Sequence, residues 1–151
     1  MRYNDGVPQN LSSSQPIGAC AILTNSKNQI LLGKRKNSYK AGMLGLPGGR
    51  IGLNEKILTA ITREVTEETG LQNLEFTFIG VVRENQDNHD FIHFIFSAPV
   101  GEQEPVLREP DKCEGWEWFE VNQDLSEVLP GHQAAIQLYI SQQKLADLVR
   151  S

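Results

Sequence analysis

The sequence predicts an α/β (α+β) domain in which helices pack on a mixed β-sheet. Several short apolar runs have the composition of strands, whereas only two segments have helical spacing, without the regular strand–helix alternation of a parallel sheet. The 151 residues fit one domain, and 39% hydrophobic and 22% charged residues are typical of a globular chain. We expect a loose or edge-bound leader over residues 1–16 and one domain over residues 17–151.

The first half of the expected domain contains a strand hairpin, a glycine-rich loop and a helix. Apolar runs over residues 17–24 and 29–35 flank the turn-like sequence TNSKNQ, which predicts the hairpin. Four glycines and a proline within residues 42–49 predict a shaped loop with a short strand at its centre. Asn54 is the expected N-cap of the helix, and Gly70 is expected to end it.

The second half contains three further strands and a C-terminal helix. Residues 74–85 and 90–99 are rich in strand-forming side chains and are separated by the turn-like sequence QDNH. Prolines and charges over residues 99–112 predict a surface loop, and residues 113–121 predict another strand. Apolar residues at roughly helical spacing over residues 130–149 predict the C-terminal helix.

Composition argues against several classes of function. No apolar run approaches the roughly 18 residues that span a bilayer, and the start is polar, so we expect no membrane partner and no signal peptide. The net charge of −5, from 14 basic and 19 acidic residues, argues against a nucleic-acid-binding surface. Cys20 and Cys113 form neither a disulfide framework nor a zinc-finger spacing. We expect both to be small buried residues of a reducing, cytoplasmic compartment.

Three acids in the first helical segment carry the most specific chemical signal. Glu64, Glu67 and Glu68 stand at i, i+3 and i+4, which places them on one side of a helix. They lie beside the apolar stripe of that helix, which consists of Ile57, Leu58, Ile61 and Val65. Like charges at i, i+4 cost about 0.2–0.5 kcal/mol when exposed, and burial raises the cost. A divalent cation such as Mg²⁺ or Mn²⁺ would offset it, but a surface ion network is equally compatible with this geometry.

Arg63 immediately precedes these acids. Glu55, expected in the first helical turn, lies eight residues before it, a little over two turns. A contact of Arg63 with Glu55 or with Glu67 would hold a ligand carboxylate in place. Taken alone, Arg63 is better explained as an ordinary surface residue of a helix.

Residues 49–71 resemble a known family signature, the Nudix box. Its defined positions are all occupied, at the family's spacing, by Gly49, Glu55, Arg63-Glu64-Val65, Glu67-Glu68 and Gly70-Leu71. The flanking sequences LLGKRK and EPDKCEGWEWF extend the resemblance over most of residues 17–145, and they are similar to the MutT-type nucleoside triphosphate diphosphatase branch. The resemblance implies a Nudix fold, a mixed sheet sandwiched between helices with the box as loop–helix–loop.

The resemblance also implies a Mg²⁺-dependent hydrolase, in which Mn²⁺ can substitute, that cleaves a diphosphate linkage. The ligands would be oxygens of one loop and one helix: the carbonyl of Gly48 and the carboxylates of Glu64, Glu67 and Glu68. Arg63 and Glu55 would orient them, and Glu67 would activate or relay the attacking water. Because the family is not uniform in its general base, an acid of a later loop is an alternative, with Glu114 favoured over Glu109.

For the substrate, this branch implies a nucleoside triphosphate that is hydrolysed in line to a nucleoside monophosphate and pyrophosphate. Bridging cations would let the phosphates approach the carboxylates. Arg35 and Lys34, on the strand before the box, and Gly49 would contact the substrate, Arg35 through a bidentate fork. The alternative is that Lys34 and Arg35 contact only solvent at the end of their strand. We expect a small-molecule nucleotide as the partner, no nucleic acid or membrane, and a monomer or homodimer.

Some positions depart from the family pattern or have no part in it. Gly52 and Asn54 stand where many boxes have Glu and Gly, which removes one acid near the metal loop. Trp116 and Trp118 alternate on one strand, and core packing explains them better than a platform for a base. No ligand spacing links the three histidines, which we expect to be structural or surface residues: His89, His93 and His132.

Two alternative functions remain open. An ADP-ribose or dinucleotide diphosphatase is the alternative within the class, although 16 leader residues are too few for the N-terminal strand domain such enzymes often carry. A Nudix module that senses nucleotide without cleaving it is the alternative from another class. Loss of the box acids is typical of such modules, and all of those acids are present in this sequence.

Overall fold

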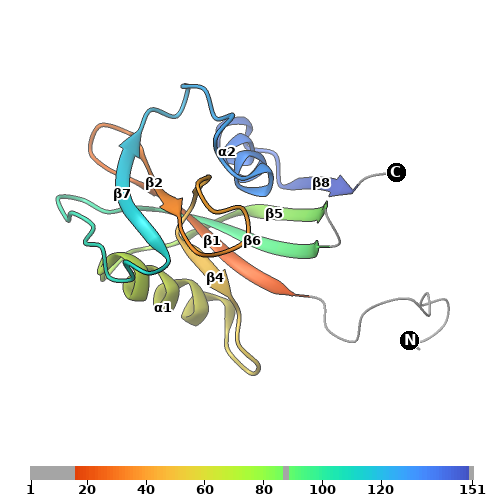
Figure 1. The fold of residues 1–151 in the computed structure, drawn as a ribbon, viewed down its shortest axis with the longest axis horizontal. Helices are drawn as coiled ribbons and strands as arrows, with labels where there is room; N and C mark the ends of the chain where they lie inside the picture. Colours follow the sequence, from red (N-terminus) through yellow and green to blue (C-terminus); the bar gives the residue numbers. More distant parts are fainter. Residues whose placement is uncertain (1–15, 87–88, 150–151) are drawn as a thin grey trace.

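The computed structural model describes residues 16–86 and 89–149, which form eight strands and two helices (Figure 1). The helices are α1 (Ile57–Thr69) and α2 (Pro130–Ser141). The strands are β1 (Ile17–Thr24), β2 (Ile30–Arg35), β3 (Leu44–Gly45), β4 (Gly48–Arg50), β5 (Thr77–Gln86), β6 (His89–Pro99), β7 (Cys113–Phe119) and β8 (Leu145–Val149). The proposed leader, apart from Pro16, and the centre of the QDNH turn lie outside the described residues.

The strands form one mixed sheet with the order β3-β2-β1-β6-β5-β8, in which β4 pairs with β1 and β7 with β2. β1 runs parallel to β6 and β5 parallel to β8, whereas the other pairs are antiparallel. The predicted hairpin of β1 and β2 and the two long strands β5 and β6 are therefore confirmed. The glycine-rich loop contributes two short strands, β3 and β4, where one was expected.

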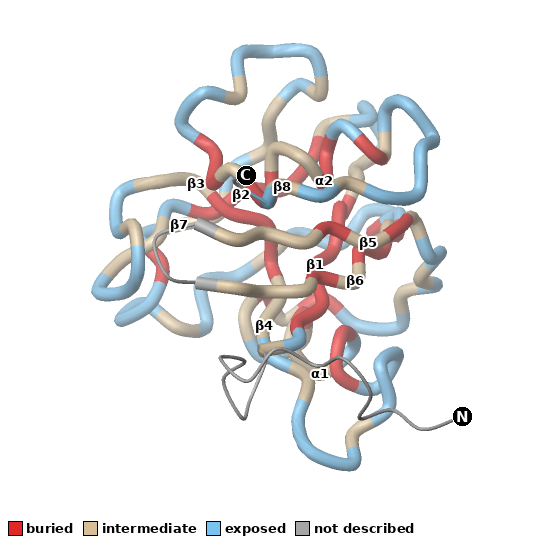
Figure 2. The backbone as a smooth tube through the Cα atoms, turned by 90° about the vertical axis from the view of Figure 1, so that its right-hand side faces the viewer, coloured by how far each residue is buried: buried red, intermediate tan, exposed pale blue. Residues whose placement is uncertain are grey.

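Each face of the sheet packs against one helix, so the sheet is sandwiched as the mixed-sheet prediction requires. Along β1, Cys20 and Ile22 belong to the core cluster that includes α2, whereas Ala19, Ala21 and Leu23 belong to the cluster that includes α1. This alternation follows from the two-residue period of a strand. Figure 2 shows the buried centre of the sheet between the two helices.

Helix α1 forms because buried residues recur at helical spacing: Ala60, Ile61, Val65 and Thr69. Gly70 ends the helix as predicted, with φ of 73° and its N–H donated to the carbonyl of Thr66. This left-handed conformation costs glycine less than other residues, because glycine has no Cβ atom.

The predicted start of α1 is wrong by two residues. The helix begins at Ile57 after Lys56, which makes no side-chain cap, and Asn54 has φ of 63°, a left-handed conformation outside any helix. Glu55 therefore precedes the helix, where its carboxylate accepts the N–H of Gly52 at 2.9 Å. Asn54 thus belongs to a local turn that the Glu55–Gly52 hydrogen bond closes, and it does not cap the helix.

The predicted C-terminal helix is also too long. α2 ends at Ser141, because Gln142 adopts φ of 62° and donates its N–H to the carbonyl of Leu138. The chain then continues as β8, whose Ala146 and Leu148 alternate inward onto the α2-side core. Over five residues, the spacing of apolar side chains in a strand cannot be told from that in a helix. The segment is a strand because it pairs with β5. With 13 and 12 residues, neither described helix is long and apolar enough to cross a membrane.

Candidate active site

A cavity of about 540 Å³ opens between β2, β4, α1 and the segment before β7. Its wall carries charges of both signs. The acids come from α1 and from the loop after β6: Glu64, Glu67, Glu68 and Glu109. The bases come from β2, β4, α1 and the same loop: Lys34, Arg35, Arg50, Arg63 and Lys112. The fold thus brings the three box acids together with both residues expected to bind phosphate.

The guanidinium of Arg63 holds the acids in fixed positions. Its Nε and Nη2 donate to the two oxygens of Glu55 at 2.7 and 2.9 Å, and its Nη1 donates to Glu64 at 2.8 Å and to Glu67 at 3.3 Å. Both contacts that the spacing predicted are therefore present. Hydrogen bonds from Arg63 and from the N–H of Gly52 lower the pKa of Glu55 to about 2, so this carboxylate stays charged.

Glu68 lies against the buried side of α1, where its charge is unfavourable. Burial raises its pKa well above the usual range, and the neighbouring Glu64 and, more weakly, Glu109 raise it further. The N–H of Gly48, at 3.4 Å from the carboxylate, opposes this shift only in part. Carboxylate oxygens crowded in this way are a donor set that fits a hard divalent cation.

Gly49 allows the strand β4 to approach Glu64. A Cβ atom at this position would lie about 2.5 Å from the carboxyl carbon of Glu64 and 2.6 Å from both of its oxygens. Any other residue would therefore push the carboxylate out of the cavity wall. This close approach explains in physical terms why a glycine begins the box.

Comparison with known proteins agrees with this geometry. The NUDIX domain family matches residues 14–139, which is most of the chain. The chain belongs to the Nudix family. It is 33% identical over 129 residues to the ADP-ribose pyrophosphatase of Methanocaldococcus jannaschii, covering 83% of this chain and 73% of that protein. It is also 33% identical over 109 residues to the oxidized purine nucleoside triphosphate hydrolase of Danio rerio, covering 67% and 64%.

A solved structure confirms the Nudix fold. The crystal structure of a MutT Nudix hydrolase from Burkholderia pseudomallei matches with a TM-score of 0.73 and 28% identity, over 83% of this chain and 98% of that one. The chain is thus a MutT-like Nudix pyrophosphohydrolase acting on nucleotide diphosphate linkages, in a family that typically uses a divalent metal.

The two residues expected to bind phosphate lie at the mouth of this Nudix cavity. Lys34 forms an ion pair with Glu114 at 3.4 Å, and both side chains are about half exposed. Arg35 donates its Nε to the carbonyl of Tyr39 at 3.0 Å, which leaves its two Nη groups outside that bond. Sequence reasoning missed Arg50, which follows Gly49 directly and also lines the cavity.

The structure does not support the preference for Glu114 as the later-loop acid. Glu114 is outside the residues that line the cavity and faces Lys34 at the surface, because β7 directs it away from α1. Glu109 lines the cavity instead and pairs with Lys112 at 3.1 Å. Of the two acids considered from the sequence, only Glu109 lies beside the box carboxylates.

Trp116 and Trp118 pack against the α1-side core, as predicted. The indole N–H of Trp116 donates to the carbonyl of Glu68 at 3.1 Å, and that of Trp118 donates to Glu104 at 3.3 Å. Trp116 also lines the cavity, so it supports the turn of α1 that carries Glu68.

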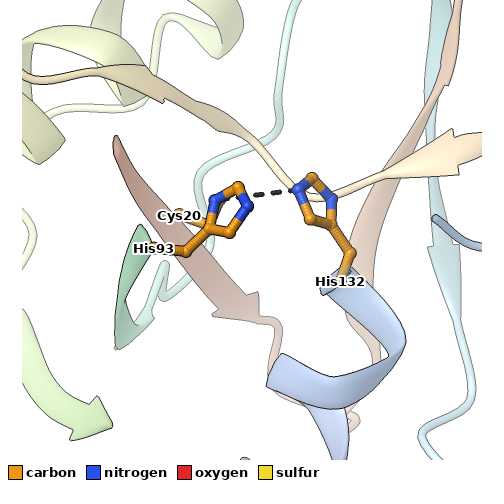
Figure 3. A group of neighbouring side chains, drawn as sticks. All are labelled: Cys20, His93 and His132. Carbon is orange, nitrogen blue, oxygen red and sulfur yellow. Dashed lines mark hydrogen bonds between the residues drawn. The ribbon is translucent and has the colours of Figure 1, made fainter. Parts of the chain in front are cut away.

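A second cavity of about 290 Å³ adjoins the first and shares with it Arg35, Leu46, Gly48, Gly49 and Arg50. On its wall the side chains of Cys20, His93 and His132 converge from β1, β6 and α2 (Figure 3). Sequence reasoning treated these residues as separate buried or surface positions. All three are buried, as was expected of Cys20, whereas the histidines were expected to be structural or surface residues. No local spacing could have shown that they meet, because 73 and 112 residues separate Cys20 from the two histidines.

The two imidazoles change the electrostatics of Cys20. Burial alone would raise the pKa of the thiol, but His132 and His93 outweigh it and hold the pKa below the usual range. Burial likewise opposes the charge on His93, yet Cys20 and Glu84 raise the pKa of its ring above the usual value. The cluster therefore favours a negative sulfur beside a positive ring.

Proposed function

We propose that this Nudix chain is a Mg²⁺-dependent nucleoside triphosphate diphosphatase that releases a nucleoside monophosphate and pyrophosphate. One observation carries the proposal: Glu64, Glu67 and Glu68 converge on a cavity that also presents Lys34 and Arg35. Acids alone would repel a triphosphate. Cationic side chains on the opposite wall can bind its terminal oxygens while the reacting linkage lies near the acids.

The residues that would hold Mg²⁺ are the carbonyl of Gly48 and the carboxylates of Glu64, Glu67 and Glu68, and Mn²⁺ would substitute at the same oxygens. When bound, the ion would neutralise charge on the phosphates and lower the pKa of coordinated water. The chain itself fixes the acids. Arg63 binds Glu55 and Glu64 at 2.7–2.9 Å, and Gly49 leaves room for the Glu64 carboxylate.

Glu67 is the residue we assign to accept the proton of the attacking water. Its side chain is 52% exposed, against 15% for Glu64, and its contact with Arg63 is the longest of the four at 3.3 Å. It can therefore reach a water molecule without breaking a short ion pair. Glu109, on the facing loop, is the second candidate for this role.

ADP-ribose is a second candidate substrate, favoured by the archaeal relative, whose name is ADP-ribose pyrophosphatase. The Danio rerio relative, named for oxidized purine nucleoside triphosphates, favours the triphosphate. Both reactions break a phosphoanhydride with water, so the same acids would serve either one. The products differ: pyrophosphate forms from a triphosphate, and AMP with a sugar phosphate forms from ADP-ribose.

The test is a hydrolysis screen with Mg²⁺ over canonical and oxidised nucleoside triphosphates and ADP-ribose, with product identification. Glu67→Gln and Glu68→Gln should each lower kcat by about 10²–10³-fold, the range for one preorganised electrostatic group. Glu75→Gln is the matched control, because Glu75 is exposed and outside the cavity lining. Undiminished turnover by both cavity variants would refute the assignment. Nucleotide binding without hydrolysis would identify a sensing module instead.

A further inference from the structure

The second cavity contains a buried sulfur that two imidazoles approach. Cys20 Sγ lies 3.6 Å from Nδ1 of His93 and 3.6 Å from Nε2 of His132. Cys20 is 4% exposed and His132 7% exposed, and both line the cavity. The ring of Phe91 stacks on His93 with centroids 4.4 Å apart, which fixes the plane of that imidazole.

Hydrogen bonding decides which ring nitrogen of His132 carries the proton. The backbone N–H of Leu46 donates to Nδ1 of His132 at 2.8 Å, so Nδ1 must be the unprotonated acceptor. The proton of the neutral ring is then on Nε2, the nitrogen that faces Cys20. His132 is therefore a donor to the sulfur, whatever the protonation of the other groups.

The same bond argues against a metal at this cluster. A histidine that ligates a metal through one nitrogen normally donates from the other nitrogen to an acceptor. At His132 the other nitrogen faces a donor, Leu46 N–H, so ligation through Nε2 would require an anionic ring or the loss of a buried hydrogen bond.

His93 is placed to take the thiol proton. Its Nδ1 faces Cys20, while its Nε2 lies 3.6 Å from an oxygen of Glu84 and has no hydrogen bond among the residues that the structure describes. The carboxylate of Glu84 favours a proton on Nε2, which leaves Nδ1 to share the remaining proton with the sulfur. Cys20, His93 and Glu84 thus have the nucleophile–base–acid order of a thiol that is activated by proton transfer.

We propose that Cys20 is a reactive thiol, activated by His93 and hydrogen-bonded by His132, that a hydroperoxide oxidises through the second cavity. The sulfur attacks the terminal oxygen of ROOH, an S–O bond forms and the O–O bond breaks. The thiol proton, held by His93 Nδ1, passes to the leaving RO⁻, so the products are Cys20–SOH and ROH. The sulfur loses two electrons and the peroxide gains them. A cavity of about 290 Å³ admits so small a reagent, and its wall includes Arg35 and Arg50, whose guanidinium N–H groups can donate hydrogen bonds that stabilise the leaving oxygen while the proton comes from His93.

Cys113 provides an internal control for this site. It is buried to a similar degree, at 9% exposed, but its Sγ donates to the carbonyl of Gly115 at 3.3 Å and no imidazole ring is among its described hydrogen-bond partners. The folded wild-type protein is treated with hydrogen peroxide and dimedone, and the adduct on each cysteine is followed by peptide mass spectrometry. We expect Cys20 to form the adduct at least about tenfold faster than Cys113, the direction set by thiolate character and access.

Two variants separate activation from exposure. Cys20→Ser should abolish the fast adduct, and His93→Gln should slow it by about tenfold or more while the Cys113 rate stays constant. The proposal is overturned if the two cysteines react at equal rates in the folded wild type, a comparison that requires no variant to fold. It is also overturned if Co²⁺ forms a one-to-one complex whose sulfur charge-transfer band disappears in Cys20→Ser, since the sulfur would then be a metal ligand.

Discussion

The two adjoining cavities share the strand β4 but hold their reactive groups in different ways. In the larger cavity, two carboxylates of α1, those of Glu64 and Glu67, are fixed by a single cation, Arg63, at 2.8 and 3.3 Å. The third, Glu68, accepts the N–H of Gly48 at 3.4 Å. In the smaller cavity, Cys20, His93 and His132 come from three separate elements and are fixed by one another and by the backbone of Leu46.

This difference has a physical consequence for each site. The larger cavity brings several carboxylates together, and its wall also carries basic side chains. We therefore expect these acids to bind a metal ion, which would in turn bind a polyanion. The smaller cavity pairs a donor, a base and a sulfur, so moving one proton from Cys20 to His93 gives a thiolate–imidazolium pair without changing the net charge. One fold thus places a carboxylate cluster on the α1 side of β4 and a thiol–imidazole cluster on the α2 side.

Among substitutions at residues that position the acids, Gly49→Ala should disrupt the larger cavity most. The added Cβ would lie about 2.5 Å from the carboxyl carbon of Glu64, so the carboxylate has to leave its position. We expect kcat/KM to fall by about 10²-fold or more, because a misplacement near 1 Å has that effect in active sites. Steady-state hydrolysis with Mg²⁺ measures it. Gly115→Ala, where nothing lies within 4 Å of the new Cβ, should stay near wild type; equal losses in both variants would contradict the steric argument.

A smaller loss of hydrolytic activity should follow when Arg63, which fixes the acids, is replaced by lysine. Arg63→Lys keeps the charge but replaces a planar fork that reaches Glu55, Glu64 and Glu67 by one ammonium group. The expected loss is about 10–100-fold in metal affinity or activity, typical of partners that orient ligands. Mg²⁺ titration of the hydrolysis rate measures it. Arg83→Lys changes the bidentate pair with Asp90, which lies outside the lining of the larger cavity, and should leave the Mg²⁺ dependence unchanged; if Arg63→Lys does so too, the orienting role is wrong.

The larger cavity could be predicted because its chemistry is local in the sequence. Glu64, Glu67 and Glu68 lie within five residues, and one turn of helix places them on one side. The mixed sheet and the strands β1, β2, β5, β6 and β7 were predictable for the same reason, since each is a continuous apolar or β-rich run. The start of α1 and the end of α2 were not, because left-handed residues at Asn54 and Gln142 decide them.

The smaller cavity could not be predicted from one sequence. Cys20 and His93 become neighbours only through the parallel pairing of β1 with β6, in which Cys20 is opposite Ile95. His132 joins them only because α2 folds onto that face of the sheet. The choice of Glu109 over Glu114 has the same origin, since a strand direction and a loop path, not spacing, decide which acid reaches the cavity.

The hydrogen bond that fixes His132 can be tested through stability. His132→Ala leaves the buried N–H of Leu46 without its acceptor, which should cost about 1–3 kcal/mol of unfolding free energy. His132→Asn places an amide oxygen near the position of Nδ1 and should lose clearly less. Urea unfolding of the two variants measures the difference. Equal losses would mean that packing of the ring, not the Leu46 bond, accounts for its contribution.

The smallest effect should appear in the pH dependence of stability without metal. Burial and Glu64 raise the pKa of Glu68 in the folded chain, so the folded state keeps a proton that the unfolded state releases above its usual pKa of 4.5. Raising the pH from about 4.5 upward therefore favours unfolding, and Mg²⁺, which displaces this proton, should stabilise the chain more as the pH rises. Thermal unfolding in EDTA between about pH 5 and 8 should show a steeper fall for wild type than for Glu68→Gln, with a difference in Tm of about 2–4 °C. Parallel profiles for the two proteins would mean that Glu68 is already ionised without a cation, and the crowding of carboxylates would then not be what draws the metal to this site.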